Sequence, residues 1–71
     1  MNIAKKLGAR IQKLRTDRGL SQEELAFESD LHRTYISHVE RGSRNITVIG
    51  LCKIAKGLGM DPSEVLKGIK F

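Results

Sequence analysis

Residue types that reinforce small domains are scarce in this sequence. Its 71 residues include one cysteine, one proline and no tryptophan, and its aromatic residues are two phenylalanines and one tyrosine. The single cysteine, Cys52, excludes an internal disulfide and cannot alone hold a structural zinc ion. A chain of this length buries only about 60% of its unfolded surface, so its stability is marginal without added support. We therefore expect association with a second copy.

Long apolar runs are also absent. No segment approaches the roughly 18 to 20 apolar residues of a membrane helix. The basic amino-terminal segment has neither the apolar centre nor the cleavage site of a secretory signal. The composition, 39% hydrophobic and 30% charged, is that of a globular domain. We therefore expect a cytoplasmic protein that makes no membrane contact.

Positive charge exceeds negative charge and is unevenly spread. The net charge of +5 favours a polyanionic partner, foremost nucleic acid, although a simply solvated basic domain has the same composition. Segments 1–20 and 33–45 are basic, whereas segment 21–32 carries four acidic residues and no lysine or arginine. This alternation indicates two faces of opposite charge.

Apolar spacing and glycines predict where the helices begin and end. Apolar residues recur at steps of three and four from Ile3 to Leu14, which predicts a first helix over residues 2–18 that stops at Gly19. A third helix is predicted over about 33–41. No segment shows the alternation of a strand, and no repeat or linker interrupts the chain.

Capping residues mark the other helix starts. Ser21 and Glu24 have capping-box spacing and predict a second helix over about 22–29. Thr47 is expected to cap a fourth helix that ends at Gly59. Asp61, followed by a proline at the first helical position, is expected to cap a fifth. The predicted fold class is therefore all-α, with five short helices in a single compact domain over residues 1–71.

The second and third predicted helices, at about 21–41, match the layout of a DNA-reading helix-turn-helix. At 100° per residue, the polar residues of the third helix fall within about a quadrant, opposite Ile36 and Val39. An ordinary surface helix with solvated polar residues fits this pattern equally well. The polar residues are Arg33, Thr34, Ser37 and Arg41.

Four stretches carry recognisable motifs: Ser21–Ala26, Arg33–Ser37, Val39–Gly42 and Leu51–Gly59. Together they resemble the Cro/CI-like (XRE) helix-turn-helix family over nearly the whole chain. Within that family, Ala26–Ser29 with Arg33–Ser37 and Ser43–Thr47 is most similar to the controller proteins of restriction-modification systems. The resemblance implies a lambda-repressor-like fold and a transcription regulator that binds double-stranded DNA.

Three positions depart from the family's pattern. Asp30 stands where the turn usually has glycine, and it adopts a left-handed backbone at some cost. His32 replaces the usual serine or threonine cap of the third helix and is a weaker cap. Ile46 replaces a loop proline and leaves an apolar residue that is available to a dimer.

The resemblance places the base-reading residues on the third helix. Arg33, at its start, is expected to bind guanine O6 and N7 with its guanidinium fork. Thr34 and Ser37 are expected to contact other base edges, with phosphate or solvent as the alternative.

The resemblance also places backbone contacts beside the groove. Gln22, at the exposed start of the second helix, resembles the family's phosphate anchor. Insertion into the minor groove is the alternative for Arg44. Arg15 and Glu40 look like the family's internal salt bridge. The expected phosphate contacts are Gln22, Tyr35, Arg44 and Asn45.

A homodimer on a palindromic operator, with half-sites about 34 Å apart, is expected because one module contacts too few base pairs. The fifth helix and tail, residues 61–71, are the expected dimer surface, and Val48 and Ile49 extend it. The alternative is that these apolar residues close the monomer's own core. The expected interface residues are Ile46, Met60, Val65, Leu66, Ile69 and Phe71.

No catalytic or metal site is expected. His32 and His38 are six residues apart, which does not match an i, i+4 metal pair. Cys52 is expected to be a packed or half-exposed thiol rather than a nucleophile. We therefore expect neither an enzyme nor a cofactor, a metal or a small-molecule ligand.

Two other functions remain open on the same fold. One is a phage-type repressor or antitoxin-like regulator, and the other is a protein-interaction module that has lost DNA reading. The intact set of Gln22, Arg33, Thr34, Arg44 and Asn45 speaks against the second. RNA polymerase is a further candidate partner of a regulator.

Overall fold

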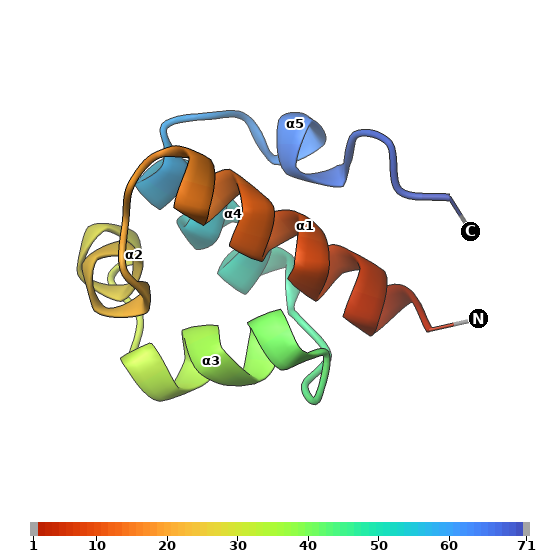
Figure 1. Ribbon diagram of the computed structural model, residues 1–71, viewed down its shortest axis with the longest axis horizontal. Helices are drawn as coiled ribbons and strands as arrows, with labels where there is room; N and C mark the ends of the chain where they lie inside the picture. The colour runs from red at the N-terminus through yellow and green to blue at the C-terminus, as the bar shows by residue number, and fades with distance from the viewer. Residues whose placement is uncertain (1, 71) are drawn as a thin grey trace.

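Each helix of the protein is short and begins at a residue that accepts hydrogen bonds from the first turn. The computed structural model describes residues 2–70, which contain no strand and no helix long and apolar enough to cross a membrane (Figure 1). The predicted all-α fold is confirmed, and α1 is one residue shorter at each end than predicted because Asn2 and Arg18 are its caps. The helices are α1 (Ile3–Asp17), α2 (Gln22–Ser29), α3 (Arg33–Arg41), α4 (Val48–Leu58) and α5 (Pro62–Leu66).

Side-chain caps start α2 and α4 as predicted. The Ser21 hydroxyl accepts from the Glu24 amide at 3.0 Å, and the Glu24 carboxylate accepts from the Ser21 amide at 2.8 Å, which completes the capping box. The hydrogen bond from the Ser21 backbone amide, with a smaller contribution from the Ser21 side chain, favours the charged carboxylate and lowers the pKa of Glu24. The Thr47 hydroxyl accepts from the Gly50 amide at 2.9 Å.

The starts of α3 and α5 lack a side-chain cap. Asp30 has φ 55° and supplies the left-handed turn residue, as expected for the position that glycine usually holds. His32 makes no capping hydrogen bond. Asp61 is the N-cap residue of α5 as predicted, but its side chain makes no capping hydrogen bond, and the amide of Glu64 donates to the Asp61 carbonyl at 2.9 Å.

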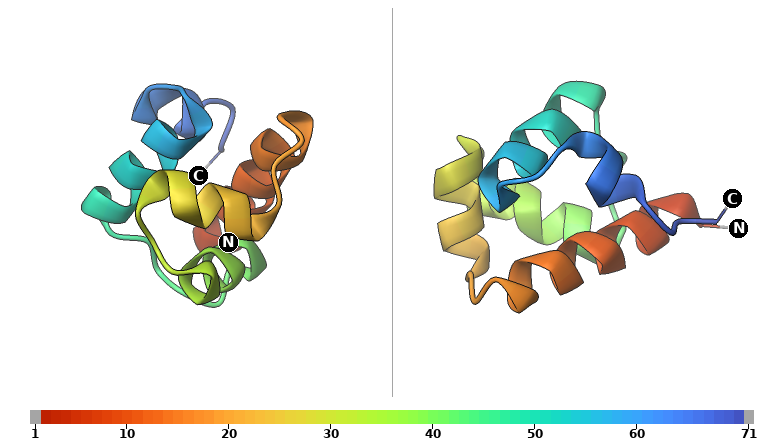
Figure 2. Two further views of the ribbon diagram at one scale, coloured as in Figure 1. Left: turned by 90° about the vertical axis from the view of Figure 1, so that its left-hand side faces the viewer. Right: turned by 90° about the horizontal axis from the view of Figure 1, so that it is seen from above.

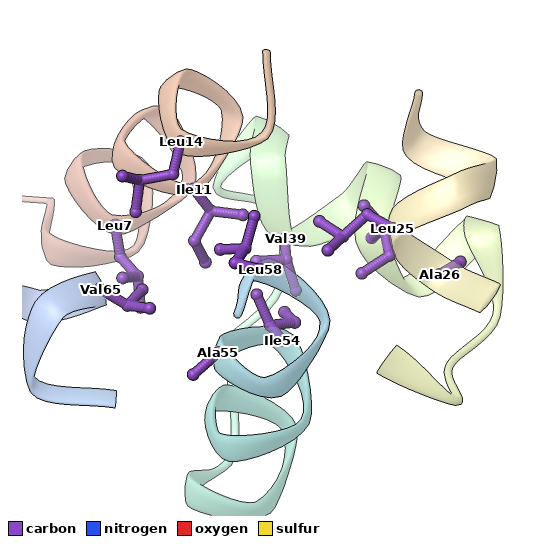
Figure 3. Close-up of a cluster of buried hydrophobic side chains, with 11 residues drawn as sticks. Leu7, Ile11, Leu14, Leu25, Ala26, Val39, Ile54, Ala55, Leu58 and Val65 are labelled. Atoms are coloured by element: carbon purple, nitrogen blue, oxygen red, sulfur yellow. The ribbon is translucent and has the colours of Figure 1, made fainter. Parts of the chain in front are cut away.

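Every helix contributes to one hydrophobic core. Figure 3 shows side chains of α1, α2 and α4 converging, with Val65 of α5 beside Leu7 of α1. Because α5 packs against both α1 and α4, it covers the gap between them (Figure 2). The buried apolar residues are Leu7, Ile11, Leu14, Leu25, Ala26, Ile36, Val39, Ile54, Ala55, Leu58 and Val65.

The core uses several residues that were expected to bind a second subunit. Val65 is fully buried, so its assignment to a dimer surface is wrong: no part of its side chain is left for a partner. Ile46, Met60 and Ile69 are half-buried and pack against the same core. Leu66 is exposed. Phe71, the last expected interface residue, lies outside the described residues.

The backbones of α1 and α3 approach most closely at Gly8. A Cβ at this position would lie 2.7 Å from the carbonyl oxygen of Glu40 and closer still to that of Val39. Both oxygens belong to backbone, so they cannot move aside as the end of a flexible side chain does. Glycine at position 8 therefore sets the distance between α1 and α3.

We expect Gly8→Ala to destabilise the fold by about 2 to 3 kcal/mol, because the added methyl group forces α1 away from α3. Helix propensity alone predicts the opposite, a gain of about 1 kcal/mol. Thermal unfolding followed by circular dichroism measures the difference. Ala9→Gly, at the next and exposed position of α1, is the control and should cost about 1 kcal/mol. A Gly8→Ala protein more stable than wild type would contradict the close approach.

Candidate nucleic-acid interface

The recognition-helix candidate, α3, buries one side and presents a polar flank on the other. Its buried side, which includes Ile36 and Val39, packs against α1 and α2. In Figure 1 α3 lies at one edge of the molecule, and α5 lies on the opposite side of α1. The outer flank consists of Arg33, Thr34 and Arg41, which are exposed, and Ser37, which is half-buried.

Most of the positive charge at this edge has no carboxylate partner. The ion pairs within residues 2–70 join Lys13 to Asp17 and Arg15 to Glu40. The guanidinium groups of Arg33 and Arg44 are therefore free of carboxylates in this part of the chain. Because both side chains are exposed, their charge is available to an anionic partner.

A buried carboxylate ties three helices together behind this flank. Arg15 donates to both oxygens of Glu40, from Nε at 2.6 Å and from Nη2 at 3.0 Å, so the predicted salt bridge is present. The hydrogen bonds to Glu40 raise the pKa of Arg15. A third Arg15 nitrogen donates to the Leu20 carbonyl at 2.7 Å, and Gln22 donates to Glu40 at 3.0 Å. The network fixes the start of α2 relative to α1 and α3.

The predicted phosphate-contacting residues do not all face outward. Arg44 and Asn45 are exposed in the loop between α3 and α4, whereas Gln22 and Tyr35 are half-buried. The guanidinium carbon of Arg44 lies 5.1 Å from the centre of the Tyr35 ring. The Tyr35 hydroxyl is buried, with no hydrogen-bond partner among the described residues. It is therefore the ring of Tyr35, and not its hydroxyl, that meets the surface.

Sequence comparison identifies the arrangement. The helix-turn-helix family matches residues 11–65, which include α2, α3 and the turn between them. The chain belongs to the XRE-type helix-turn-helix family. The control protein C.BamHI of Bacillus amyloliquefaciens is 47% identical to it over 66 residues, which cover 92% of this chain and 82% of that protein.

Solved structures of the XRE-type family share the fold. The restriction-modification controller protein C.AhdI from Aeromonas hydrophila has a TM-score of 0.85 and 47% identity, and the match covers 87% of this chain and 94% of that one. The controller protein C.Esp1396I, solved as a tetramer in complex with its natural 35 base-pair operator, has a TM-score of 0.89 and 39% identity, with 97% and 91% covered. This member of the family is therefore similar to controller proteins over most of its length.

Several surface features of this family member were not predicted. Phe27 on α2 is 84% exposed, although an aromatic residue within a helix usually indicates core. His38 Nδ1 lies 2.9 Å from a guanidinium nitrogen of Arg41, because the turn of α3 places these two side chains next to each other. Cys52 is exposed, so the prediction of a packed or half-exposed thiol is corrected: it lies on the outer face of α4. No group of metal-binding side chains occurs in residues 2–70.

We expect Glu40→Gln to destabilise the protein by about 3 kcal/mol or more, because it leaves the Arg15 charge without its partner. Both side chains are largely withdrawn from water, with 11% of Arg15 and 3% of Glu40 exposed. Chemical denaturation measures the free energy of unfolding. Glu28→Gln, an exposed carboxylate on α2, is the matched control and should change it by less than about 0.5 kcal/mol. Equal effects of the two substitutions would show that the network does not hold α3.

Proposed function

We propose that this protein is a sequence-specific DNA-binding transcription regulator, a restriction-modification controller that acts as a homodimer on palindromic operators. The observation that carries the proposal is the open flank of α3. Arg33 and Thr34 are exposed there, while the opposite side of the helix is held by the core and by the network of Glu40. A rigid helix with free hydrogen-bonding side chains suits the major groove.

Base reading is proposed for Arg33, Thr34 and Ser37. The guanidinium of Arg33, at the first position of α3, presents a fork of donors that matches guanine O6 and N7. Thr34 and Ser37 offer hydroxyl groups to neighbouring base edges, and the methyl group of Thr34 suits thymine.

Backbone contacts are proposed for Gln22, Arg44 and Asn45. One hydrogen of the Gln22 amide nitrogen is donated to Glu40, and the second remains available to a phosphate oxygen beside the first turn of α2. Arg44 and Asn45 are exposed in the loop that follows α3. Such contacts set the orientation of the protein on the duplex and make its affinity depend on salt.

A dimer surface is proposed on the outer face of α4 together with α5. Val48 and Ile49 are 77% and 70% exposed, and Leu66 is 40% exposed. Association would remove these apolar side chains from water. A two-fold dimer places two copies of α3 about one helical turn of DNA apart. RNA polymerase is the proposed further partner, because a regulator bound near a promoter acts on it. The proposed role requires no catalysis.

Selection of binders from a randomised duplex pool at near-physiological salt tests the proposal. We expect enrichment of a palindrome with half-site centres about 10 base pairs apart. Weak binding that depends on salt but shows no enrichment would instead favour the protein-interaction module.

We expect Arg33→Ala to abolish the preference at one base position, worth about 1 to 3 kcal/mol, and to leave weak salt-dependent binding. Fluorescence anisotropy on the selected duplex and on its single-base variants measures this loss. Lys13→Ala, a cation on α1 paired with Asp17, is the control and should leave the preference intact. An equal loss on all sequences would remove Arg33 from base reading.

We expect Ile49→Asp to weaken dimerisation, because the interface would then bury a charge. Sedimentation velocity over a range of protein concentrations measures the change. Phe27→Asp, which alters another exposed apolar residue on α2, is the matched control and should leave the dimer intact. An unchanged mass for Ile49→Asp would remove α4 from the interface.

A further inference from the structure

A groove with a basic lining runs between α1 and the tail that follows α5, residues 67–70 (Figure 2). Its volume is about 540 Å³. In Figure 1, α1 separates α5 from α3, so this α1–tail groove faces away from the recognition-helix candidate. Within residues 2–70, four of its seven lining residues are cations and none is acidic; the cations are Lys6, Arg10, Lys67 and Lys70.

The α1–tail groove is held in shape by contacts between the two ends of the chain. Lys6 Nζ donates to the Lys70 carbonyl at 2.9 Å, 64 positions further along the sequence. Arg10 Nη2 donates to the Glu64 carbonyl, also at 2.9 Å. Because both acceptors are backbone carbonyls, these hydrogen bonds fix the tail beside α1 and leave the two positive charges uncompensated.

The conformation of the tail places its own lysines at the same groove. Gly68 has φ 83°, in the left-handed region that favours glycine. Ile69, which follows it, is half-buried and packs against the core. Lys67 and Lys70, on either side of this pair, are exposed. The turn at Gly68 thus anchors the tail through Ile69 and adds two ammonium groups to the cations of α1.

The four cations have no acidic partner within residues 2–70. Lys13, the next cation along this face of α1, differs from them because it pairs with Asp17 at 3.1 Å. Arg10 Nε is buried and makes no hydrogen bond among the described residues, which is unfavourable for a donor. Like charges held close together repel one another, so an anion that enters the groove gains interaction energy with all of them.

The side chains that line the α1–tail groove suit phosphates better than a protein partner. Among residues 2–70 they include no aromatic side chain, whereas the centres of protein interfaces are enriched in aromatic residues and depleted in lysine. They also include no hydroxyl or amide group with which to read a base edge. Lysine and arginine alone bind the phosphate backbone of DNA without reading its sequence.

We propose that the α1–tail groove is a second DNA-binding surface, which takes the phosphate backbone of a duplex other than the one bound along α3. The protein is 21 Å across its two shorter axes, and the groove and α3 lie on opposite sides of α1, so one straight duplex does not reach both. A homodimer on its operator then bridges to a second stretch of DNA. Binding in the groove stands by itself, whereas bridging rests on the proposed function.

An NMR titration in two stages, at about 0.15 M salt, separates the two surfaces. The selected duplex, added first at one per dimer, should shift the backbone amide signals of Thr34 and Ser37. A random-sequence duplex, added second, should shift those of Ala9, Gly68 and Ile69. Groove signals that stay unchanged in the second stage, or that move completely in the first, would overturn the proposal.

The same spectra keep failure of the proposed function distinct from failure of this inference. If selection yields no preferred duplex, the proposed function is wrong, and the random-sequence duplex is added to the free protein. Shifts at Gly68 and Ile69 would then still establish the groove as a DNA surface. Shifts there with polyglutamate but not with duplex would assign the groove to an acidic protein partner and would overturn the proposal.

Lys67→Gln combined with Lys70→Gln removes two of the four charges. The affinity of the preformed operator complex for a labelled random-sequence duplex, measured by fluorescence anisotropy, should fall roughly 10- to 30-fold at about 0.15 M salt, and its salt slope should fall by about 2. The affinity for the selected duplex should not change, because α3 is untouched. An unchanged affinity for the second duplex would overturn the proposal.

Two controls show whether the position of the charge matters. Lys67→Arg combined with Lys70→Arg keeps both charges in the groove and should retain the second duplex. Lys13→Gln removes a cation that Asp17 already neutralises, and it should change this affinity less than about twofold. A loss with Lys13→Gln as large as that of the double substitution would indicate attraction by net charge alone and would overturn the groove as a site.

Discussion

One buried carboxylate orients the helix-turn-helix. Glu40 on α3 accepts hydrogen bonds from Arg15 on α1 and from Gln22 on α2. A charged group in this position is costly unless every lone pair has a donor, and here the donors come from two other helices. The helices consequently have one mutual arrangement that satisfies the network. This arrangement brings the first turn of α2 next to α3, so that both lie at one edge of the molecule.

The helices of this fold enclose a small core. α5 has only one fully buried apolar side chain, Val65, yet it covers the gap between α1 and α4. At Gly8 the backbones of α1 and α3 lie so close that no side chain fits between them. With so little interior, the apolar side chains of Val48 and Ile49 stay in water in the monomer, and a second copy is a natural way to cover them.

The candidate interface combines rigid and adjustable parts. Arg33 and Thr34 belong to a helix with a fixed position, which suits the reading of base edges, where small displacements lose hydrogen bonds. Arg44 belongs to a loop, where a long side chain has many conformations. Its guanidinium carbon lies 5.1 Å from the centre of the Tyr35 ring, and it has no carboxylate partner within residues 2–70. The charge of Arg44 thus stays available to an anionic partner.

The sequence by itself determined the helices and the residues on the outer flank of α3, because helix starts, stops and amphipathic faces depend on neighbours within about four positions. The capping box of Ser21, the cap of Thr47 and the left-handed Asp30 were all predicted. Tertiary structure alone decided that Val65 closes the core, that Phe27 and Cys52 face water, and that Lys6 lies beside Lys70. Burial and contact at these residues depend on helices distant in the chain, and no local pattern of residues encodes how those helices pack.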